Sequence, residues 1–226
     1  MEDDGHLSTF STSNISFRQI QPEDHNDIKK LHEEFFPVRY VDAFYDDAVL
    51  GRGIGGQPLI TIIATVPMEK NGKSSQIIGF IFAQFMATRR CDERNLFYAT
   101  NTPPKLFYIL TLGVKQEYRK LGLATALVQK CIVCAKNDSS CGLIYLHVIH
   151  YNQAAIRLYE TLGFQHIKTL TDFYTIEDKV YDSYLYGFYI NDYQGQILTL
   201  FVTNLRYYAL SHVLLSTFPL ILFSLL

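Results

Sequence analysis

The sequence predicts a mixed α/β (α+β) domain in which a twisted central sheet of about seven strands is flanked by about four helices. Across residues 15–191, apolar runs with strand character alternate with segments of helical periodicity. Within that region, residues 106–114 are almost entirely apolar and rich in β-branched and aromatic side chains, which is typical of a strand buried on both faces. Residues 1–14 are expected to be a polar, disordered N-terminus, and residues 192–226 an apolar tail outside the domain.

Composition excludes several classes of protein. With 226 residues, of which 48% are hydrophobic, the chain can bury the core of one domain plus an appendage. A formal net charge of -2, with scattered lysines and arginines, gives no surface for nucleic acid. Because the first 14 residues contain no apolar run of the kind that a secretory signal needs, we expect the domain to face the cytosol.

The four cysteines do not predict a disulfide framework or a metal site. Cys131 and Cys134 have the spacing of a zinc-binding pair. Both fall on an apolar helical face, however, and no suitable fourth ligand stands nearby. We therefore expect reduced thiols and no metal.

The N-terminal half should contain, in order, a strand (15–20), a helix opened by Pro22, a shorter helix (41–50) and an antiparallel strand pair (59–66 and 76–85). Residues 36–40 break the first helix, and residues 88–105 form a polar insertion. The glycine-rich segment 51–56 formally satisfies the dinucleotide-binding fingerprint. That motif needs a strand before it and a helix after it, whereas here a strand follows, so we predict a flexible loop.

The C-terminal half should contain, in order, the central strand (106–114), a helix from near Gly122, a strand (142–150), a helix between Asn152 and Gly163, and a closing strand pair (174–190). Apolar residues recur at three- and four-residue spacing after Gly122, which indicates one buried helix face. Two strands joined by one helix are expected to be parallel, with a right-handed crossover.

The turn at residues 115–122 has two interpretations. A helix start carries unpaired N–H groups and partial positive charge, so a glycine-lined entry beside Arg119 and Lys120 could bind an anion such as a pyrophosphate. The alternative is an ordinary tight strand-to-helix turn.

Strand alternation points to two polar side chains as candidate functional residues. Tyr108 shares one face of the central strand with Leu110 and Leu112, and His147 shares a face of the next strand with Leu143 and Tyr145. If the two strands are parallel neighbours that splay apart, Tyr108 and His147 line opposite sides of one cleft. The alternative is a core tyrosine and a hydrogen-bonded core histidine.

The tail is apolar enough to meet a membrane. From residue 197 to residue 226, Arg206 is the single formally charged residue. The last 17 residues would span about 26 Å as a helix, which is short for a bilayer core, and Pro219 would kink it. Short interfacial helices or a re-entrant pair fit at least as well. The alternative is a tail that packs on the domain or in a dimer.

The order of these elements, together with the turn from Arg119 to Ala124, resembles the GNAT acetyltransferase fold. Four segments are similar to the N-terminal acetyltransferases of the E and F types: residues 36–40, residues 108–114, residues 144–148, and Asn152 with Tyr159 and Glu160. The tail favours the F type, whose relatives sit on the cytosolic side of Golgi membranes. The resemblance covers about residues 15–191.

The resemblance implies that Tyr108 and His147 deprotonate the incoming amine, directly or through a water. A protein α-amino group titrates near pH ~7.7–8.0 and a lysine near ~10.4, so an imidazole is a better-matched base for an N-terminus. Backbone N–H groups near Leu112 and Val114 would stabilise the oxyanion, Asn152 would bind the pantetheine arm, and Tyr159 could protonate the leaving thiolate. The implied acetyl-CoA-binding residues are Leu112, Gly113, Val114, Arg119, Lys120, Leu121, Gly122, Leu123, Ala124, Thr125, Asn152, Tyr159, Glu160, Thr161 and Leu162.

By the same resemblance, an apolar pocket holds the first side chain of the substrate, often methionine. Its implied wall is Phe36, Pro37, Val38, Tyr40, Leu110, Phe173 and Tyr174. These aromatic residues could instead only plug the end of the sheet. Arg39 departs from the acidic residue expected in the F type, and a cation beside the cleft would repel an ammonium terminus.

The expected function is thus acetyl-CoA-dependent N-alpha-acetylation of proteins, including Met-starting, cytosol-facing N-termini of membrane proteins. Expected partners are protein N-termini and membrane lipid, with no nucleic acid, and the chain is expected to be a monomer or a weak homodimer. The expected location is the cytosolic face of an intracellular membrane, the Golgi by resemblance. The alternatives are a GNAT enzyme acting on lysine, including histones, or on a small amine, and a non-catalytic membrane-docking module.

Overall fold

The computed structural model describes residues 14–68, 75–91, 96–97, 102–193 and 224–225. The N-terminal half contains, in order, β1 (Ser16–Arg18), α1 (His25–Phe35), α2 (Asp42–Val49), β2 (Leu59–Pro67) and β3 (Ser75–Ala87). The C-terminal half contains, in order, β4 (Lys105–Val114), α3 (Leu123–Lys136), β5 (Cys141–Ile149), α4 (Gln153–Thr161), β6 (Gln165–Ile176), β7 (Lys179–Tyr189) and β8 (Ser224–Leu225).

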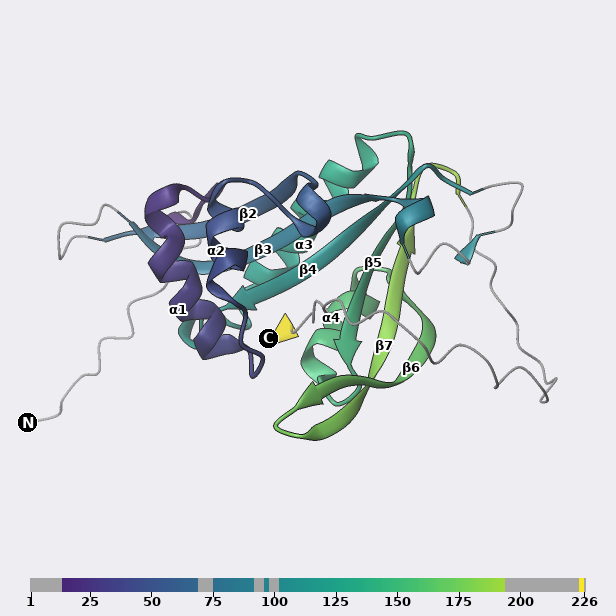
Figure 1. Ribbon diagram of the computed structural model, residues 1–226. Coiled ribbons are helices and arrows are strands. Elements are labelled where there is room, and N and C mark those ends of the chain that lie inside the picture. The colour runs from purple at the N-terminus through teal and green to yellow at the C-terminus, as the bar shows by residue number, and fades with distance from the viewer. Residues whose placement is uncertain (1–13, 69–74, 92–95, 98–101, 194–223, 226) are drawn as a thin grey trace, which may run out of the picture.

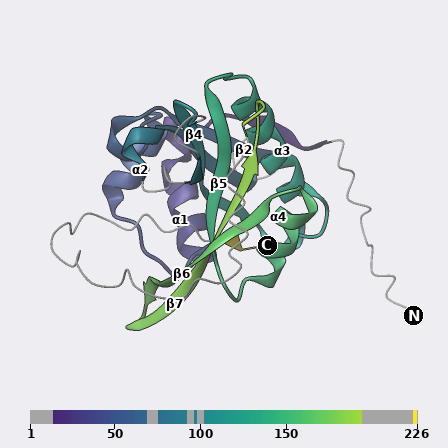
Figure 2. The ribbon, with the colours of Figure 1, turned by 90° about the vertical axis from the view of Figure 1, so that its right-hand side faces the viewer.

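All strands belong to one mixed sheet with the order β1-β2-β3-β4-β5-β7-β6, and β8 pairs with β4 beside this path. The helices α1 and α2 cover one face of the sheet, and α3 and α4 cover the other (Figures 1 and 2). The predicted mixed α/β architecture, with seven main strands and four α-helices among the described residues, is confirmed. The core lies on both sides of the central strands because β3, β4 and β5 are buried along most of their length.

Two predicted strand bounds are wrong. β6 begins at Gln165 rather than at 174, and β1 covers three residues instead of 15–20. β6 is an edge strand that pairs with β7 only, and most of its first nine side chains are exposed. Register shifts also interrupt its pairing between His166 and Lys168 and between Leu170 and Tyr174. An edge strand of this kind lacks the apolar alternation by which a strand is recognised in a sequence.

The glycine-rich segment 51–56 is a loop, as predicted, because it leads into β2. The side chain of the buried Gln84 on β3 accepts a hydrogen bond from the backbone N–H of Ile54 at 2.7 Å. A Cβ atom at Gly53 would lie 2.2 Å from the same Gln84 oxygen, so a glycine is needed there. The backbone of segment 51–56 is thus hydrogen-bonded to the sheet through Gln84. A dinucleotide site needs a strand before the glycines and a helix after them, whereas this segment follows α2 and leads into β2.

The central strand β4 has different neighbours along its length. It is antiparallel to β3, with a bulge that leaves Leu110 without an opposite residue. It is parallel to β5, as predicted, but among the described residues this pairing ends at Tyr108 opposite Tyr145. Beyond that point the two strands separate, so the far half of β4 has a free edge towards β5. Unpaired edges of this kind attract another strand.

The strand at this free edge comes from the C-terminal tail. Ser224 and Leu225, which form β8, lie parallel to β4 opposite Leu112 and Gly113. At these two residues the tail pairs with the domain as a strand, in line with the alternative of a tail that packs on the domain. The rest of the predicted tail helix, residues 194–223, lies outside the described residues. Within the described part of the chain, no helix is long and apolar enough to cross a membrane.

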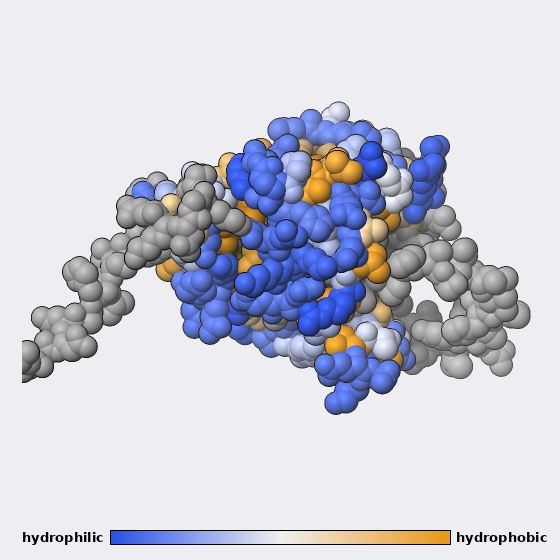
Figure 3. Space-filling view, turned by 60° about the vertical axis from the view of Figure 1, so that its left-hand side comes forward, coloured by the Kyte–Doolittle hydropathy of each residue, from blue (hydrophilic) through white to orange (hydrophobic). Residues whose placement is uncertain are grey.

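The surface of the described domain is largely polar on the face turned forward in Figure 3. Hydrophobic residues appear there as small, separate groups between larger hydrophilic areas. Scattered apolar residues of this kind are normal on a protein surface. This face therefore gives no sign of a broad membrane-binding surface on the domain itself.

His32 on α1 is a fully buried titratable group of the core. Its ring stacks on Phe80 at a centroid distance of 4.5 Å and contacts five further aromatic rings. Nδ1 lies 3.0 Å from the backbone oxygen of Ile28, and Nε2 has no hydrogen-bond partner in the described part of the chain. Burial among apolar rings lowers the pKa of His32 to about 4, because the charged form loses its hydration.

We expect this histidine to make the fold acid-sensitive. The unfolded chain binds a proton near the reference pKa of 6.5 and the folded chain near 4, so stability is lost as pH falls through this window. The free energy of unfolding should drop by about 2 kcal/mol between pH 7 and pH 5 from this residue alone. Urea denaturation of the wild type and of His32→Phe at both pH values measures the difference. An equal pH dependence in the two proteins would contradict the assignment.

Candidate active site

A cavity of about 620 Å³ opens between the turn that follows β4 and the helix α4. Seven of the predicted cofactor-binding residues line it: Val114, Arg119, Lys120, Gly122, Leu123, Ala124 and Thr125. Five further lining residues were not predicted: Gln116, Tyr118, Ala154, Arg157 and Leu158. The structure thus brings the turn and the first residues of α3 together around one hollow.

The start of α3 has the features of an anion-binding site. Gly122 is its N-cap, with a φ of +79° that favours glycine, and no side chain caps the helix. The N–H groups of the first helical turn, at Leu123, Ala124 and Thr125, therefore have no partner within the helix. Arg119 donates from Nε to the backbone oxygen of Val114 at 3.0 Å, which fixes the turn to the end of β4. Helix starts of this kind bind phosphate groups.

Asn152 does not itself line the cavity, but it carries an unpaired donor two residues before the lining residue Ala154. Its Oδ1 accepts a hydrogen bond from the N–H of Ala155 at 3.1 Å, which confirms the predicted cap of α4. Its Nδ2 is buried and has no partner among the described residues. A buried, unpaired amide donor is costly, so a ligand that carries a carbonyl oxygen fits this position.

Other predicted cofactor residues do not line this cavity. Tyr159 is fully buried and packs its ring against Phe164, and Glu160 accepts a hydrogen bond from the hydroxyl of Tyr186 at 2.8 Å. Leu112 and Gly113 pair with β8 at the free edge of β4. Leu121, Thr161 and Leu162 are also absent from the lining. Helix periodicity explains part of this result, because Ala154, Arg157 and Leu158 form the face of α4 towards the cavity.

The second feature of the site is a contact between Tyr108 and His147. The hydroxyl of Tyr108 lies 3.2 Å from Nδ1 of His147, and the two rings meet edge to face at 5.6 Å. Both side chains are 6% exposed. They belong to β4 and β5 at the place where these strands begin to separate. The predicted splay thus brings both side chains into contact, in a largely buried position.

Tyr145 is a site residue that was not predicted. Its ring stacks on that of Tyr108, with centroids 4.7 Å apart and planes within 11°. Its hydroxyl lies 3.1 Å from Sγ of Cys91 and 3.4 Å from Sδ of Met86. Alternation along β5 places Tyr145 and His147 on one face, so a signal was present. The partners Cys91 and Met86, which come from distant segments, could not be read from that pattern.

The predicted substrate residues divide into three groups. Phe36 and Tyr174 are buried in the core, and burial raises the pKa of Tyr174. Phe173 stacks on His147 at 4.7 Å, and Leu110 forms the bulge of β4. The remaining members, Pro37, Val38 and Tyr40, lie between α1 and α2 with more exposure. Phe173 therefore contacts His147, whereas Phe36 and Tyr174 lie in the core.

Arg39 lies near the end of α1. It is exposed, and its Nη1 donates to the backbone oxygen of Glu33 at 3.1 Å, near the end of α1. A cation is favourable at the C-terminus of a helix because of the helix dipole. Its guanidinium group thus contacts the end of α1.

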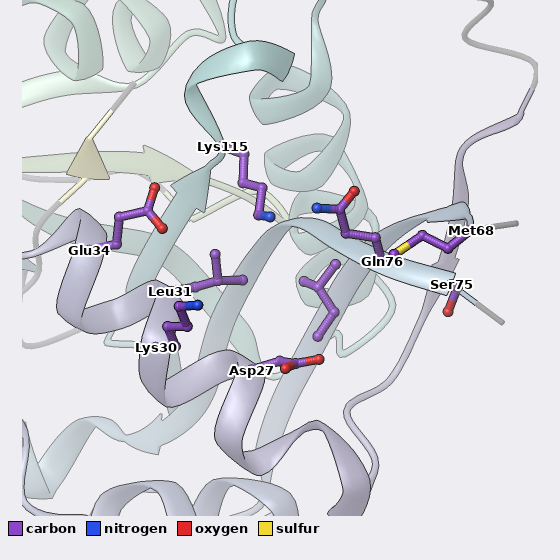
Figure 4. A pocket seen from close by; sticks show the side chains of 9 residues that line it. Asp27, Lys30, Leu31, Glu34, Met68, Ser75, Gln76 and Lys115 are labelled. Atoms are coloured by element: carbon purple, nitrogen blue, oxygen red, sulfur yellow. The ribbon is translucent and has the colours of Figure 1, made fainter. Parts of the chain in front are cut away.

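A second, smaller cavity of about 240 Å³ lies between α1 and the ends of β2 and β3 (Figure 4). Its charged lining residues are Asp27, Lys30, Glu34 and Lys115, two of each sign. Neither Tyr108 nor His147 lines it. Among the described residues, no cluster of histidine, cysteine and carboxylate side chains is placed to hold a metal, and the four cysteines are free thiols. The larger cavity and the Tyr108–His147 pair are therefore the candidate active site.

Comparison with known proteins identifies the family of the chain. Residues 16–164 match the acetyltransferase (GNAT) family. Histone acetyltransferase MCC1 of Arabidopsis thaliana is 32% identical over 179 residues, covering 78% of this chain and 70% of that protein. N-alpha-acetyltransferase 60 of Danio rerio is 31% identical over 190 residues, covering 82% and 74%.

Solved structures give the same result. The crystal structure of Arabidopsis thaliana NAA60 in complex with acetyl-CoA has 35% sequence identity and a TM-score of 0.71, and covers 78% of this chain and 99% of that chain. The same relative has also been solved in complex with a bisubstrate analogue. The chain therefore belongs to the GNAT acetyltransferase family, and within it is similar to N-alpha-acetyltransferase 60.

Proposed function

We infer that this protein transfers the acetyl group of acetyl-CoA to the N-terminal amines of proteins. The observation that carries this inference is the contact between Tyr108 and His147 at the point where β4 and β5 separate. The cavity at the start of α3 lies by the far end of the same strand β4. Relatives that carry the name N-alpha-acetyltransferase 60, one of them solved with acetyl-CoA, support the assignment.

The residues of the cavity fit acetyl-CoA. Its pyrophosphate matches the uncapped start of α3 beside Arg119 and Lys120. The amide carbonyls of its pantetheine arm match the unpaired Nδ2 of Asn152. An arm that runs along β4 from this cavity would have to displace β8 from Leu112 and Gly113.

Acetyl-CoA supplies the acetyl group as a thioester, so the amine forms a C–N bond while the C–S bond breaks and CoA leaves as a thiol. A protonated amine has no free electron pair, and the proton must move before or during attack. We assign this proton transfer to the imidazole of His147, which contacts the Tyr108 hydroxyl. Phe173, whose ring stacks on the imidazole, restrains the orientation of the ring.

Tyr145 should hold Tyr108 in the orientation that this step needs. Tyr145→Leu removes the stacked ring, and we expect kcat to fall by about 10-fold, in line with ~1.5 kcal/mol for an aromatic pair. Tyr145→Phe keeps the ring and should retain most of the activity, although it loses the contacts to Cys91 and Met86. Calorimetric titration with acetyl-CoA serves as the control, because neither change should alter that affinity. A larger loss with phenylalanine than with leucine would contradict the role.

The function is tested by thiol release. Purified protein is incubated with acetyl-CoA and peptides that begin Met-Lys, Met-Leu or Met-Ala, and free CoA is measured. We expect release with at least one free N-terminus and none when the α-amine of the same peptide is blocked. Absence of release with every peptide would overturn the assignment.

A second candidate function is acetylation of lysine side chains. The 32% identity to a protein named Histone acetyltransferase MCC1 favours testing it. An N-terminally blocked, lysine-containing histone peptide separates the two. Release of CoA from this peptide at a rate equal to that with free N-termini would favour the lysine reaction.

We propose that the enzyme works on Met-starting, cytosol-facing N-termini at an intracellular membrane such as the Golgi, held there by its apolar tail. The support is compositional, since Arg206 is the single formally charged residue from position 197 to position 226. We expect a chain that ends at Asn191 to move from the membrane fraction to the soluble fraction of cells. If the shortened chain still sediments with membranes, the tail is not the anchor.

A further inference from the structure

A third cation faces the cofactor cavity from the helix α4. Arg157 lines the cavity together with Ala154 and Leu158, at the three- and four-residue spacing of one helix face. The other two cations, Arg119 and Lys120, come from the turn before α3. The cavity is thus bounded by positive charge from two separate elements.

No negative charge of the protein balances these cations within the cavity. Its lining contains no aspartate and no glutamate. Arg157 is exposed and has neither an ion pair nor a hydrogen bond with any described residue. By contrast, Arg119 already donates to the backbone of Val114. The guanidinium group of Arg157 is therefore free to bind an anionic ligand.

Acetyl-CoA likewise carries its negative charge on two separate groups. Its pyrophosphate needs one anion site, which the start of α3 with Arg119 and Lys120 provides. Its 3′-phosphate is a separate phosphomonoester on the ribose. Arginine presents a planar fork of donors that matches phosphate oxygens, and it is less strongly hydrated than lysine. A second arginine on the α4 side of the cavity suits this second anionic group.

We propose that Arg157 binds the 3′-phosphate of coenzyme A and so distinguishes the coenzyme from its dephospho form. The proposal rests on the inference that this cavity holds acetyl-CoA. It adds a residue of α4 to the cofactor-binding set and assigns it to one phosphate. Arg119, Lys120 and the start of α3 then contribute to the affinity for both forms.

Calorimetric titration of the full chain with CoA and with 3′-dephospho-CoA tests the assignment. Wild type should bind CoA more tightly than dephospho-CoA, and Arg157→Gln should bind CoA about 10- to 100-fold more weakly, the range for a hydrogen bond to a charged group. The affinity for dephospho-CoA should not change. Arg157→Lys keeps the charge without the fork and should lose less than Arg157→Gln.

Two further variants make the test specific. Lys179→Gln removes the same charge at an exposed site in the hairpin of β6 and β7, and should leave both affinities unchanged. Arg119→Gln should weaken both ligands. If Arg157→Gln weakens CoA and dephospho-CoA equally, or weakens neither, the assignment to the 3′-phosphate is overturned while the proposed function stands. If wild type binds neither ligand, the proposed function falls as well.

Discussion

Replacing His147 with alanine is expected to lower kcat for N-terminal acetylation by about 10²- to 10⁴-fold, the range for loss of a general base. The imidazole contacts the Tyr108 hydroxyl, and the ring of Phe173 stacks on it. Tyr108→Phe removes the hydroxyl and keeps the stacked ring, so its loss should be large but smaller. Because the two groups touch, the double variant should lose less than the product of the single losses.

The control for this prediction is a histidine that does not belong to the Tyr108–His147 pair. His166→Gln changes an exposed histidine on β6 and should leave kcat unchanged. The KM for acetyl-CoA should stay constant in all these variants, because neither Tyr108 nor His147 lines the cofactor cavity. If His147→Ala retains more than a tenth of the wild-type kcat, this histidine is not the base.

The second large effect is expected at Asn152, which has one structural and one ligand-binding group. Asn152→Asp keeps the oxygen that caps α4 but removes the amide donor, so we expect acetyl-CoA to bind roughly 10- to 100-fold more weakly with little loss of stability. Asn152→Ala removes both groups and should also cost about 1 kcal/mol of unfolding free energy. Titration calorimetry and thermal unfolding measure the two effects separately.

The assignment requires that Asn152→Asp lowers the affinity for acetyl-CoA without lowering the stability of the fold. Equal affinity of the wild type and Asn152→Asp for acetyl-CoA would show that the unpaired Nδ2 does not contact the ligand. A large stability loss in Asn152→Asp would show instead that the amide is needed for the fold. In the first case the fit of the pantetheine arm to this residue would be wrong, while the anion site at the start of α3 would be unaffected.

Local sequence patterns predicted much of the fold because each pattern had one strong physical cause. The apolar run of β4 and the spacing along α3 reflect burial, and the placement of Gly122 reflects a left-handed backbone at the helix start. The parallel pairing of β4 with β5 follows from the helix that joins them. Strand alternation then sufficed to predict that Tyr108 and His147 face each other.

The remaining features depend on contacts between distant segments. Tyr145 is held by Cys91 from the insertion before β4, and no local pattern links these residues. β6 was predicted to start too late because an exposed edge strand lacks apolar alternation. Arg157 was not predicted, since its place on the cavity wall depends on how α4 packs beside the turn of Arg119. The pairing of β8 arises from a free edge that exists only after β4 and β5 separate.

The central claim is that the acetyl group reaches an α-amine through the Tyr108–His147 site, and one measurement tests it most directly. A peptide with both a free Met-Lys N-terminus and an internal lysine is incubated with acetyl-CoA and the full chain, and fragmentation mass spectrometry locates the acetyl group. We expect acetyl on the α-nitrogen with wild type and almost none with His147→Ala. Acetyl found mainly on the lysine side chains, or equal α-acetylation by the two proteins, would contradict the account.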